Sequence, residues 1–137
     1  MNKLYMLVLL LIGAYFAYQE MGPVDSQPGV VQQRPAEAWR SGQQVSGQGT
    51  VTRILSDDND GSRHQRFILR LDSGRTLLVA HNIDLAPRIA ALQTGDTVSF
   101  YGEYEWNDRG GVIHWTHHDP QGRHADGWLV HDGRRYE

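Results

Sequence analysis

Cysteine is absent from the 137-residue chain, and lysine occurs only once, as Lys3. The protein therefore has no disulfide bonds, thiolate zinc sites, iron–sulfur clusters, cysteine nucleophiles or cysteine-linked lipid anchor. Acidic side chains (16) outnumber basic ones (13), which gives a formal net charge of −3. This charge argues against general nucleic-acid binding, which normally needs a basic surface. The G-x-S-x-G, P-loop and dinucleotide-binding motifs are also missing, so the corresponding enzyme classes have no support in the sequence.

An apolar run without charged side chains occupies residues 4–18 (LYMLVLLLIGAYFAY). Lys3 precedes this run and the next basic residue is Arg34, a bias that places the N-terminus in the cytoplasm and the remainder outside. As a helix the run spans about 22 Å, which is short against a hydrocarbon core of about 30 Å. We therefore predict that residues 1–20 form an apolar helix that is either a signal anchor or a cleaved signal peptide. Both alternatives predict a periplasmic protein, anchored in the inner membrane or secreted after cleavage.

Residues 21–43 have the composition of a flexible tether. They are rich in proline, glycine and glutamine and show almost no apolar periodicity. Trp39, near the end of this segment, is expected to pack on the domain that follows. Residues 44–137 are long enough for one domain.

The domain has the alternation and turn residues that are typical of β-strands. Five strands are expected, at residues 47–55, 64–71, 76–81, 97–106 and 112–117. A short helix is expected at residues 84–92, because Asp84 suits an N-cap and Pro87 is tolerated in a first turn. This order predicts an all-β fold, namely an OB-type five-stranded Greek-key barrel with one short helix between strands 3 and 4.

The C-terminal tail contains two short apolar runs on either side of Asp132-Gly133. An Asp-Gly pair in this position is a strong hairpin signal. We therefore predict a C-terminal β-hairpin that packs on the barrel through Trp128 and Tyr136.

Histidines are concentrated in the C-terminal half, where six of the seven lie between residues 81 and 131. In an OB barrel the third and fifth strands are parallel neighbours, which would bring His81 close to residues 117–119. His117 and Asp119 would share one face of the fifth strand about 6.6 Å apart, and a turn would return His124. The sequence therefore predicts a site for a divalent metal such as zinc, formed by His81, His117, Asp119 and His124. The alternative is that these side chains form structural hydrogen bonds at strand ends.

Two functional hypotheses follow, and a structural adaptor in an envelope complex is a third. The first is a membrane-tethered extracytoplasmic OB-fold binding module, whose ligand is a small molecule, an oligosaccharide or an envelope protein. The second is a divalent-metal-dependent hydrolase, with phosphodiesters as a candidate substrate class. In that hypothesis His118 is the general base and Arg123 the partner of the oxyanion.

A specific motif in the C-terminal half supports a family resemblance. The motif is HWTHHDP at residues 114–120, continued by Gly122, His124, Gly127 and Trp128. With HNIDLAPRI at residues 81–89, this pattern resembles a bacterial family of short exported OB-like proteins, the domain of unknown function DUF3465. The resemblance covers roughly residue 45 to the end of the chain. It implies no known activity, substrate or catalytic residue.

Overall fold

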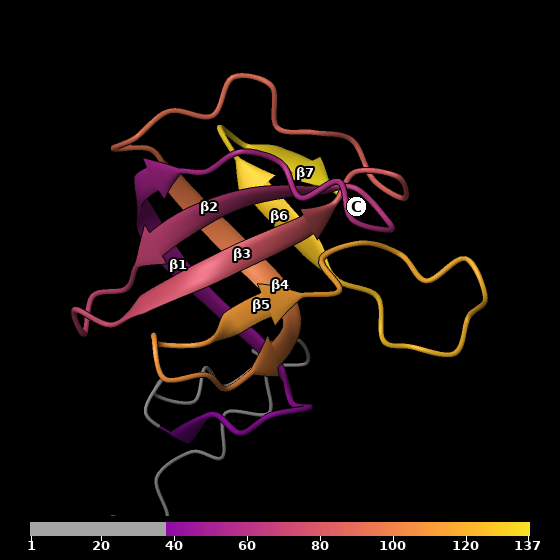
Figure 1. Ribbon diagram of the computed structural model, residues 1–137, viewed down its shortest axis with the longest axis horizontal. Helices are drawn as coiled ribbons and strands as arrows, with labels where there is room; N and C mark the ends of the chain where they lie inside the picture. The colour runs from indigo at the N-terminus through magenta and orange to yellow at the C-terminus, as the bar shows by residue number, and fades with distance from the viewer. Residues whose placement is uncertain (1–37) are drawn as a thin grey trace, which may run out of the picture. The chain divides into compact units, whose positions relative to one another are not determined.

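Alternating apolar and polar residues form seven β-strands in the computed structural model, which describes residues 38–137 (Figure 1). The strands are β1 (Gln44–Ile54), β2 (His64–Arg70), β3 (Thr76–Asn82), β4 (Thr97–Glu105), β5 (Val112–His114), β6 (Trp128–His131) and β7 (Arg134–Tyr136). The predicted N-terminal helix and most of the tether lie outside the described residues. Within residues 38–137 the structure contains no helix with the length and apolar character of a membrane span.

The first five strands close into a barrel because β1 pairs with two partners. Its first half is antiparallel to β4, from Gln44 opposite Glu103 to Thr50 opposite Thr97. Its second half is antiparallel to β2, with a register shift between Val51 and Arg53. β2 then pairs with β3, β3 with β5, and β5 with β4, which completes the ring of paired strands. This strand order confirms the prediction of an all-β, five-stranded OB-type barrel.

The parallel pair of β3 and β5 determines which loops become neighbours. Leu78 lies opposite Val112, and Val79 lies opposite Ile113. Because the two strands run in the same direction, both end at the same rim of the barrel (Figure 1). The predicted adjacency of the third and fifth strands is therefore confirmed.

The barrel interior is filled by apolar side chains at alternate positions of the strands. The fully buried members include Val51, Phe67, Leu69, Leu77, Val79, Val98, Phe100, Tyr104, Ile113 and Leu129. Trp39 closes one side of this core, with its ring 6.0 Å from Phe100 in an edge-on contact and 5.7 Å from Tyr104. The expected packing of Trp39 on the domain is thus observed.

The predicted C-terminal hairpin is also present. Strands β6 and β7 are antiparallel around Asp132 and Gly133, both of which have positive φ angles. β6 adds to the free edge of β4, where Trp128 lies opposite Tyr101, and Tyr136 is buried. The hairpin therefore extends the barrel sheet.

The helix predicted at residues 84–92 is wrong, because the structure has only turns there. A single turn forms where the Ala86 amide donates to the Asn82 carbonyl, and Pro87 then supplies no amide hydrogen. Further along, the Gln65 side chain donates from Nε2 to the Ile89 carbonyl and accepts at Oε1 from the Ile89 amide, at 2.9 Å each. The segment is thus held by side chains of distant strands instead of by helical hydrogen bonds.

The fifth strand is shorter than predicted, since β5 ends at His114 instead of residue 117. The next residue, Trp115, has a φ of 55°, which is an uncommon conformation for a bulky residue and stops strand pairing. At Gly127 the chain comes back next to Trp115, and the Gly127 amide donates to the His117 carbonyl at 2.9 Å. A Cβ on Gly127 would overlap the Trp115 carbonyl oxygen and lie 2.5 Å from that of Tyr101. The loop of residues 115–127 therefore closes only with glycine at its end.

Replacing Gly127 with alanine is expected to lower the free energy of unfolding by roughly 2–3 kcal/mol, because backbone atoms must move to admit the methyl group. Gly122→Ala is the matched control in the same loop. Its φ of 65° is strained for alanine, but no atom lies within 4 Å of the added Cβ, so a loss of about 1 kcal/mol is expected. Urea unfolding of both full-length variants measures the difference. Equal losses would show that the close approach at Gly127 is not a constraint.

His81 is a buried structural histidine at the end of β3. Its Nε2–H donates to the Pro87 carbonyl at 2.9 Å, and its Nδ1 accepts from the Thr116 hydroxyl at 2.7 Å. Burial lowers the pKa of His81 from 6.5 to about 4. Between these pH values the unfolded chain binds a proton that the folded protein excludes. The contribution of His81 to stability is therefore complete above pH 6.5 and decreases as the pH falls toward 4.

His81→Gln is expected to weaken this pH dependence, since glutamine offers a donor and an acceptor but does not titrate. From pH 7 to pH 5 the wild-type chain should lose about 2 kcal/mol more unfolding free energy than the variant, at about 1.4 kcal/mol per pH unit below the unfolded pKa. Urea titrations at both pH values, followed by tryptophan fluorescence, provide the comparison. Parallel pH profiles would contradict the neutral, buried state of His81.

Candidate functional site

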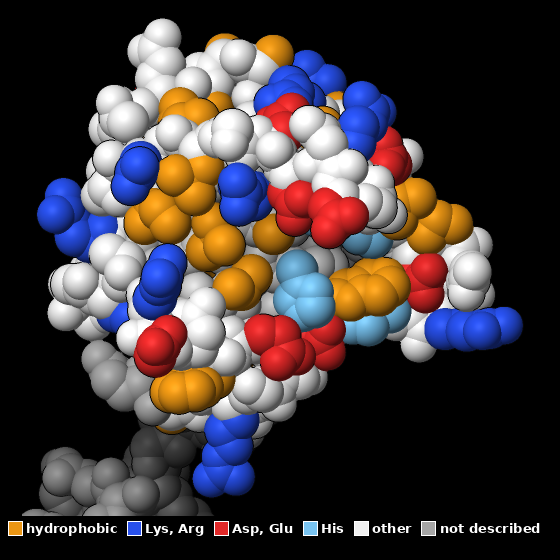
Figure 2. Space-filling model, viewed as in Figure 1, with side chains coloured by type: hydrophobic (Ala, Val, Ile, Leu, Met, Phe, Trp, Pro, Cys, Tyr) orange, Lys and Arg blue, Asp and Glu red, His pale blue; other side chains and the backbone are white. Residues whose placement is uncertain are grey.

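A pocket of about 200 Å³ opens at the rim where β2 begins and where β3 and β5 end. Its walls are formed by His64, Asn82, Leu85, His114, Trp115 and His117. OB folds use the face around strands 2 and 3 to bind oligonucleotides and oligosaccharides. In Figure 2, histidine side chains gather on one face beside a hydrophobic side chain, with acidic side chains on both sides.

Two of the pocket histidines are oriented by main-chain carbonyl groups. Nδ1 of His64 lies 2.8 Å from the Ser62 carbonyl, and Nδ1 of His117 lies 2.6 Å from the His118 carbonyl. A carbonyl oxygen only accepts, so each Nδ1 carries the hydrogen. In the neutral ring the Nε2 atom is then a hydrogen-bond acceptor. The two imidazoles therefore supply acceptors, and metal-ligand lone pairs, at the pocket.

Trp115 forms an apolar wall of the pocket, has a positive φ and stacks on a histidine. Its ring lies 3.9 Å from that of His124, with an interplanar angle of 9°, and 5.3 Å from that of His117. A positive φ at a residue other than glycine costs about 1–3 kcal/mol and is frequent at functional sites. The strain at this wall is thus independent support for a functional pocket.

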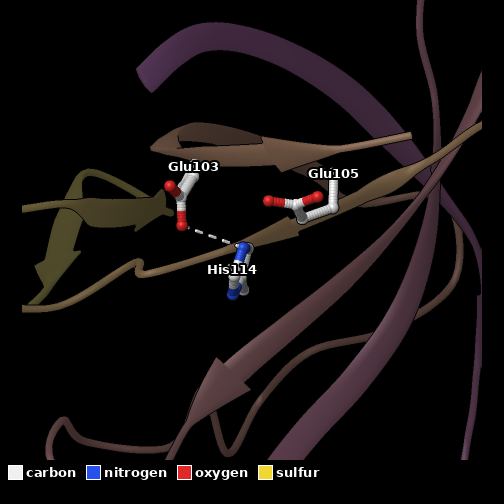
Figure 3. A group of neighbouring side chains, drawn as sticks. All are labelled: Glu103, Glu105 and His114. Atoms are coloured by element: carbon white, nitrogen blue, oxygen red, sulfur yellow. Dashed lines mark ion pairs between the residues drawn. The ribbon is translucent and has the colours of Figure 1, made fainter. Parts of the chain in front are cut away.

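A carboxylate–imidazole group lies beside the pocket on β4 and β5 (Figure 3). Ligand atoms of Glu103, Glu105 and His114 all lie within 4.8 Å of one another. Nε2 of His114 is 3.1 Å from Oε2 of Glu103. Burial lowers the pKa of His114, although Glu103 opposes this effect, so the neutral imidazole is favoured. These side chains offer the donor atoms that divalent metals bind.

Of the four predicted metal ligands, His124 is the one that reaches this group. Its Nε2 lies 3.5 Å from Oε2 of Glu103, while its Nδ1 lies 2.8 Å from the Ala125 carbonyl. His117 lines the adjacent pocket. His81 has both ring nitrogens engaged in structural hydrogen bonds, which leaves no lone pair for a metal.

Asp119 organises the loop of residues 115–127. Its carboxylate accepts hydrogen bonds from the backbone amides of Gln121, Arg123 and His124 at 2.8–2.9 Å. These amides hold the pKa of Asp119 below its usual value. Among the described residues the four predicted ligands do not form a converging group. The reason is that residues 117–119 belong to this loop, so the two-residue spacing of a strand does not apply to them.

The two predicted catalytic residues, His118 and Arg123, both lie on the loop of residues 115–127 and are exposed. Nδ1 of His118 is 3.1 Å from Asp126 and its Nε2 is 3.4 Å from Glu137. The hydrogen bond with Asp126 raises the pKa of His118, which favours the protonated ring and makes it a poor general base. Arg123 is exposed on the same loop. Among the described residues neither side chain forms an ion pair with Glu103, and the catalytic roles of His118 and Arg123 stay a prediction.

Four titratable residues of the site were not predicted from the sequence: His64, Glu103, Glu105 and His114. The positions of Glu103, Glu105 and His114 could have been predicted from strand pairing. The turn before β5 creates an antiparallel pair with β4, and this register puts Glu103 directly opposite His114. Alternation along β4 places Glu105 on the same face as Glu103. A cross-strand reading of this hairpin would have found the group.

Comparison with known proteins agrees with the motif in the tail. The family model described as "Protein of unknown function (DUF3465)" matches residues 17–137. No curated protein and no solved structure matches the chain. Since the family model covers most of the sequence, the earlier resemblance is confirmed: the chain belongs to the DUF3465 family.

Proposed function

We propose that this protein is an extracytoplasmic OB-fold binding module that takes a neutral saccharide into the pocket at the barrel rim. The observation that carries this proposal is the pocket itself, which combines oriented imidazoles with apolar walls on a strained loop. Its position near β2 and β3 matches the side on which OB folds bind extended polar ligands.

The chemistry of the pocket favours a ligand that carries hydroxyl groups. His64 and His117 present acceptor nitrogens, as their Nδ1 atoms are engaged by carbonyl groups. The Oδ1 atom of Asn82 accepts from the Asp84 amide, which leaves the amide NH₂ as a donor. Leu85 and Trp115 add apolar surface. A sugar ring has a matching character, with hydroxyl groups at its edge and C–H groups on its faces.

The surrounding charge disfavours anionic ligands. Glu103 and Glu105 lie next to His114 at the pocket wall. Residues 44–137 carry thirteen acidic side chains against ten arginines. A polyanion such as a nucleic acid would be repelled by this field, whereas a neutral saccharide would not.

Leu85→Asn tests the pocket. Leu85 is 45% exposed and lines the pocket, whereas Ile54 is 43% exposed and does not, so Ile54→Asn is a matched control. Chitotriose and maltotriose are the probes, with isothermal titration of the full-length chain in detergent as the measurement. Loss of apolar contact at Leu85 is expected to weaken binding of the preferred trisaccharide about tenfold, and Ile54→Asn should leave it unchanged.

Absence of binding to both trisaccharides at millimolar concentration would contradict the saccharide proposal. Equal weakening by both variants would place the ligand outside the pocket. Displacement of the saccharide by a single-stranded oligonucleotide would contradict the charge argument.

The location of the protein is a second part of the proposal. The apolar run at residues 4–18 and the lone preceding lysine support export, with residues 1–20 as inner-membrane anchor or cleaved signal. We expect the barrel to be digested by protease added to spheroplasts, whereas a chain beginning at residue 38 should stay protected in the cytoplasm. Protection of the full-length chain would contradict export, and mass spectrometry of its N-terminus distinguishes anchor from cleaved signal.

A further inference from the structure

We propose that Glu103, Glu105, His114 and His124 form a binding site for one divalent transition metal of the zinc type. The site lies on the outer face of the β4–β5 pair, next to the pocket. It goes beyond the proposed saccharide binding and does not depend on it.

The fold places three of these ligands without any loop. Glu103 and Glu105 are two residues apart on β4, so their side chains leave the same face of the sheet. His114 lies directly opposite Glu103 in the antiparallel pair of β4 and β5. Figure 3 shows both carboxylates and the His114 ring directed toward a common point. Because strands position these atoms, the geometry is more rigid than one built on loops alone.

The distances fit the coordination sphere of a small metal ion. In a tetrahedral site with bonds of about 2.1 Å, neighbouring ligand atoms are about 3.4 Å apart. Oε2 of Glu103 lies 3.1 Å from Nε2 of His114 and 3.5 Å from Nε2 of His124. One ligand atom from each of Glu103, Glu105 and His114 lies within 4.8 Å of the other two, so these three side chains already stand close to the spacing that one metal ion needs.

The hydrogen-bond pattern indicates lone pairs that face one another. Nδ1 of His124 donates to the Ala125 carbonyl, so in the neutral ring Nε2 is an acceptor 3.5 Å from a Glu103 carboxylate oxygen, which is also an acceptor. Nε2 of His114 is buried and near Glu103, but their alignment does not make a hydrogen bond. A metal-binding histidine usually donates the N–H of one ring nitrogen to a carbonyl or carboxylate and binds the metal through the other nitrogen.

The charge of the group also matches a dication. Among the described residues neither Glu103 nor Glu105 forms an ion pair with an arginine. Glu103 is only 20% exposed, so its charge is not fully screened by water. Two carboxylates and two imidazoles would neutralise a divalent ion, and this nitrogen and oxygen donor set is suited to zinc and its neighbours.

Direct metal titration tests the site. The full-length chain, purified without a histidine tag, is stripped with chelator and titrated with Zn²⁺ by calorimetry and with Co²⁺ by visible absorption. We expect one metal ion per chain. Glu105→Gln and His124→Gln should each weaken binding by about tenfold or more, since each removes a ligand. The Glu105 side chain has no hydrogen bond or ion pair among the described residues, and its backbone pairing with Val112 is kept in Glu105→Gln, so the substitution is not expected to affect folding.

His118→Gln is the matched control, because His118 lies on the same loop but contacts two other carboxylates, those of Asp126 and Glu137. It should leave the affinity and the Co²⁺ spectrum unchanged. No stoichiometric binding by the wild-type chain would overturn the proposal. So would loss of binding in His118→Gln with full binding retained in both ligand variants. Saccharide titration of the metal-free chain keeps the two proposals separate, as it needs no metal.

Discussion

The parallel pairing of β3 with β5 is the constraint on which the candidate site depends. Two strands that run in the same direction must end at the same rim, so segments more than 30 residues apart in sequence become neighbours. The hydrogen bond between His81 and Thr116, which are 35 residues apart, fastens these two ends together inside the protein. The pocket and the carboxylate–imidazole group share His114, which ends β5 at this rim. The barrel topology therefore creates the rim on which the candidate site lies.

The barrel could be predicted from local signals because most of its strands carry their own pattern of alternating apolar and polar residues. Alternation in β2 and β4, together with glycine turns, is enough to give number, order and boundaries of most strands. The segment after β3 was different, because its local signals favour a helix. Gln65 overrides them from 24 residues away by bonding both backbone groups of Ile89. A long-range hydrogen bond of this kind has no signature within the segment that it shapes.

The sequence predicts a site in the histidine-rich tail, but it does not predict which of these side chains lie close together. Alternation in the sequence predicts a strand through residue 117, whereas Trp115 leaves the extended conformation with a φ of 55°. After that residue, spacing along the chain no longer predicts spacing in space. The sheet pair of Glu103 and His114 was predictable from register alone. The approach of His124 was not, because it depends on the Asp119 hydrogen bonds and on stacking with Trp115.

One edge of β4 is shared by two strands that are distant in the chain. β5 occupies this edge at residues 103–105, and β6 occupies it at residues 98–101. The chain thus leaves the sheet after His114 and rejoins the same edge at Trp128, with Gly127 at the point of return. The loop of residues 115–127 is therefore an insertion between two strands that pair with the same edge of β4. The excursion can change in length and chemistry while the barrel that carries it keeps its architecture, which gives evolution a way to vary specificity without rebuilding the scaffold.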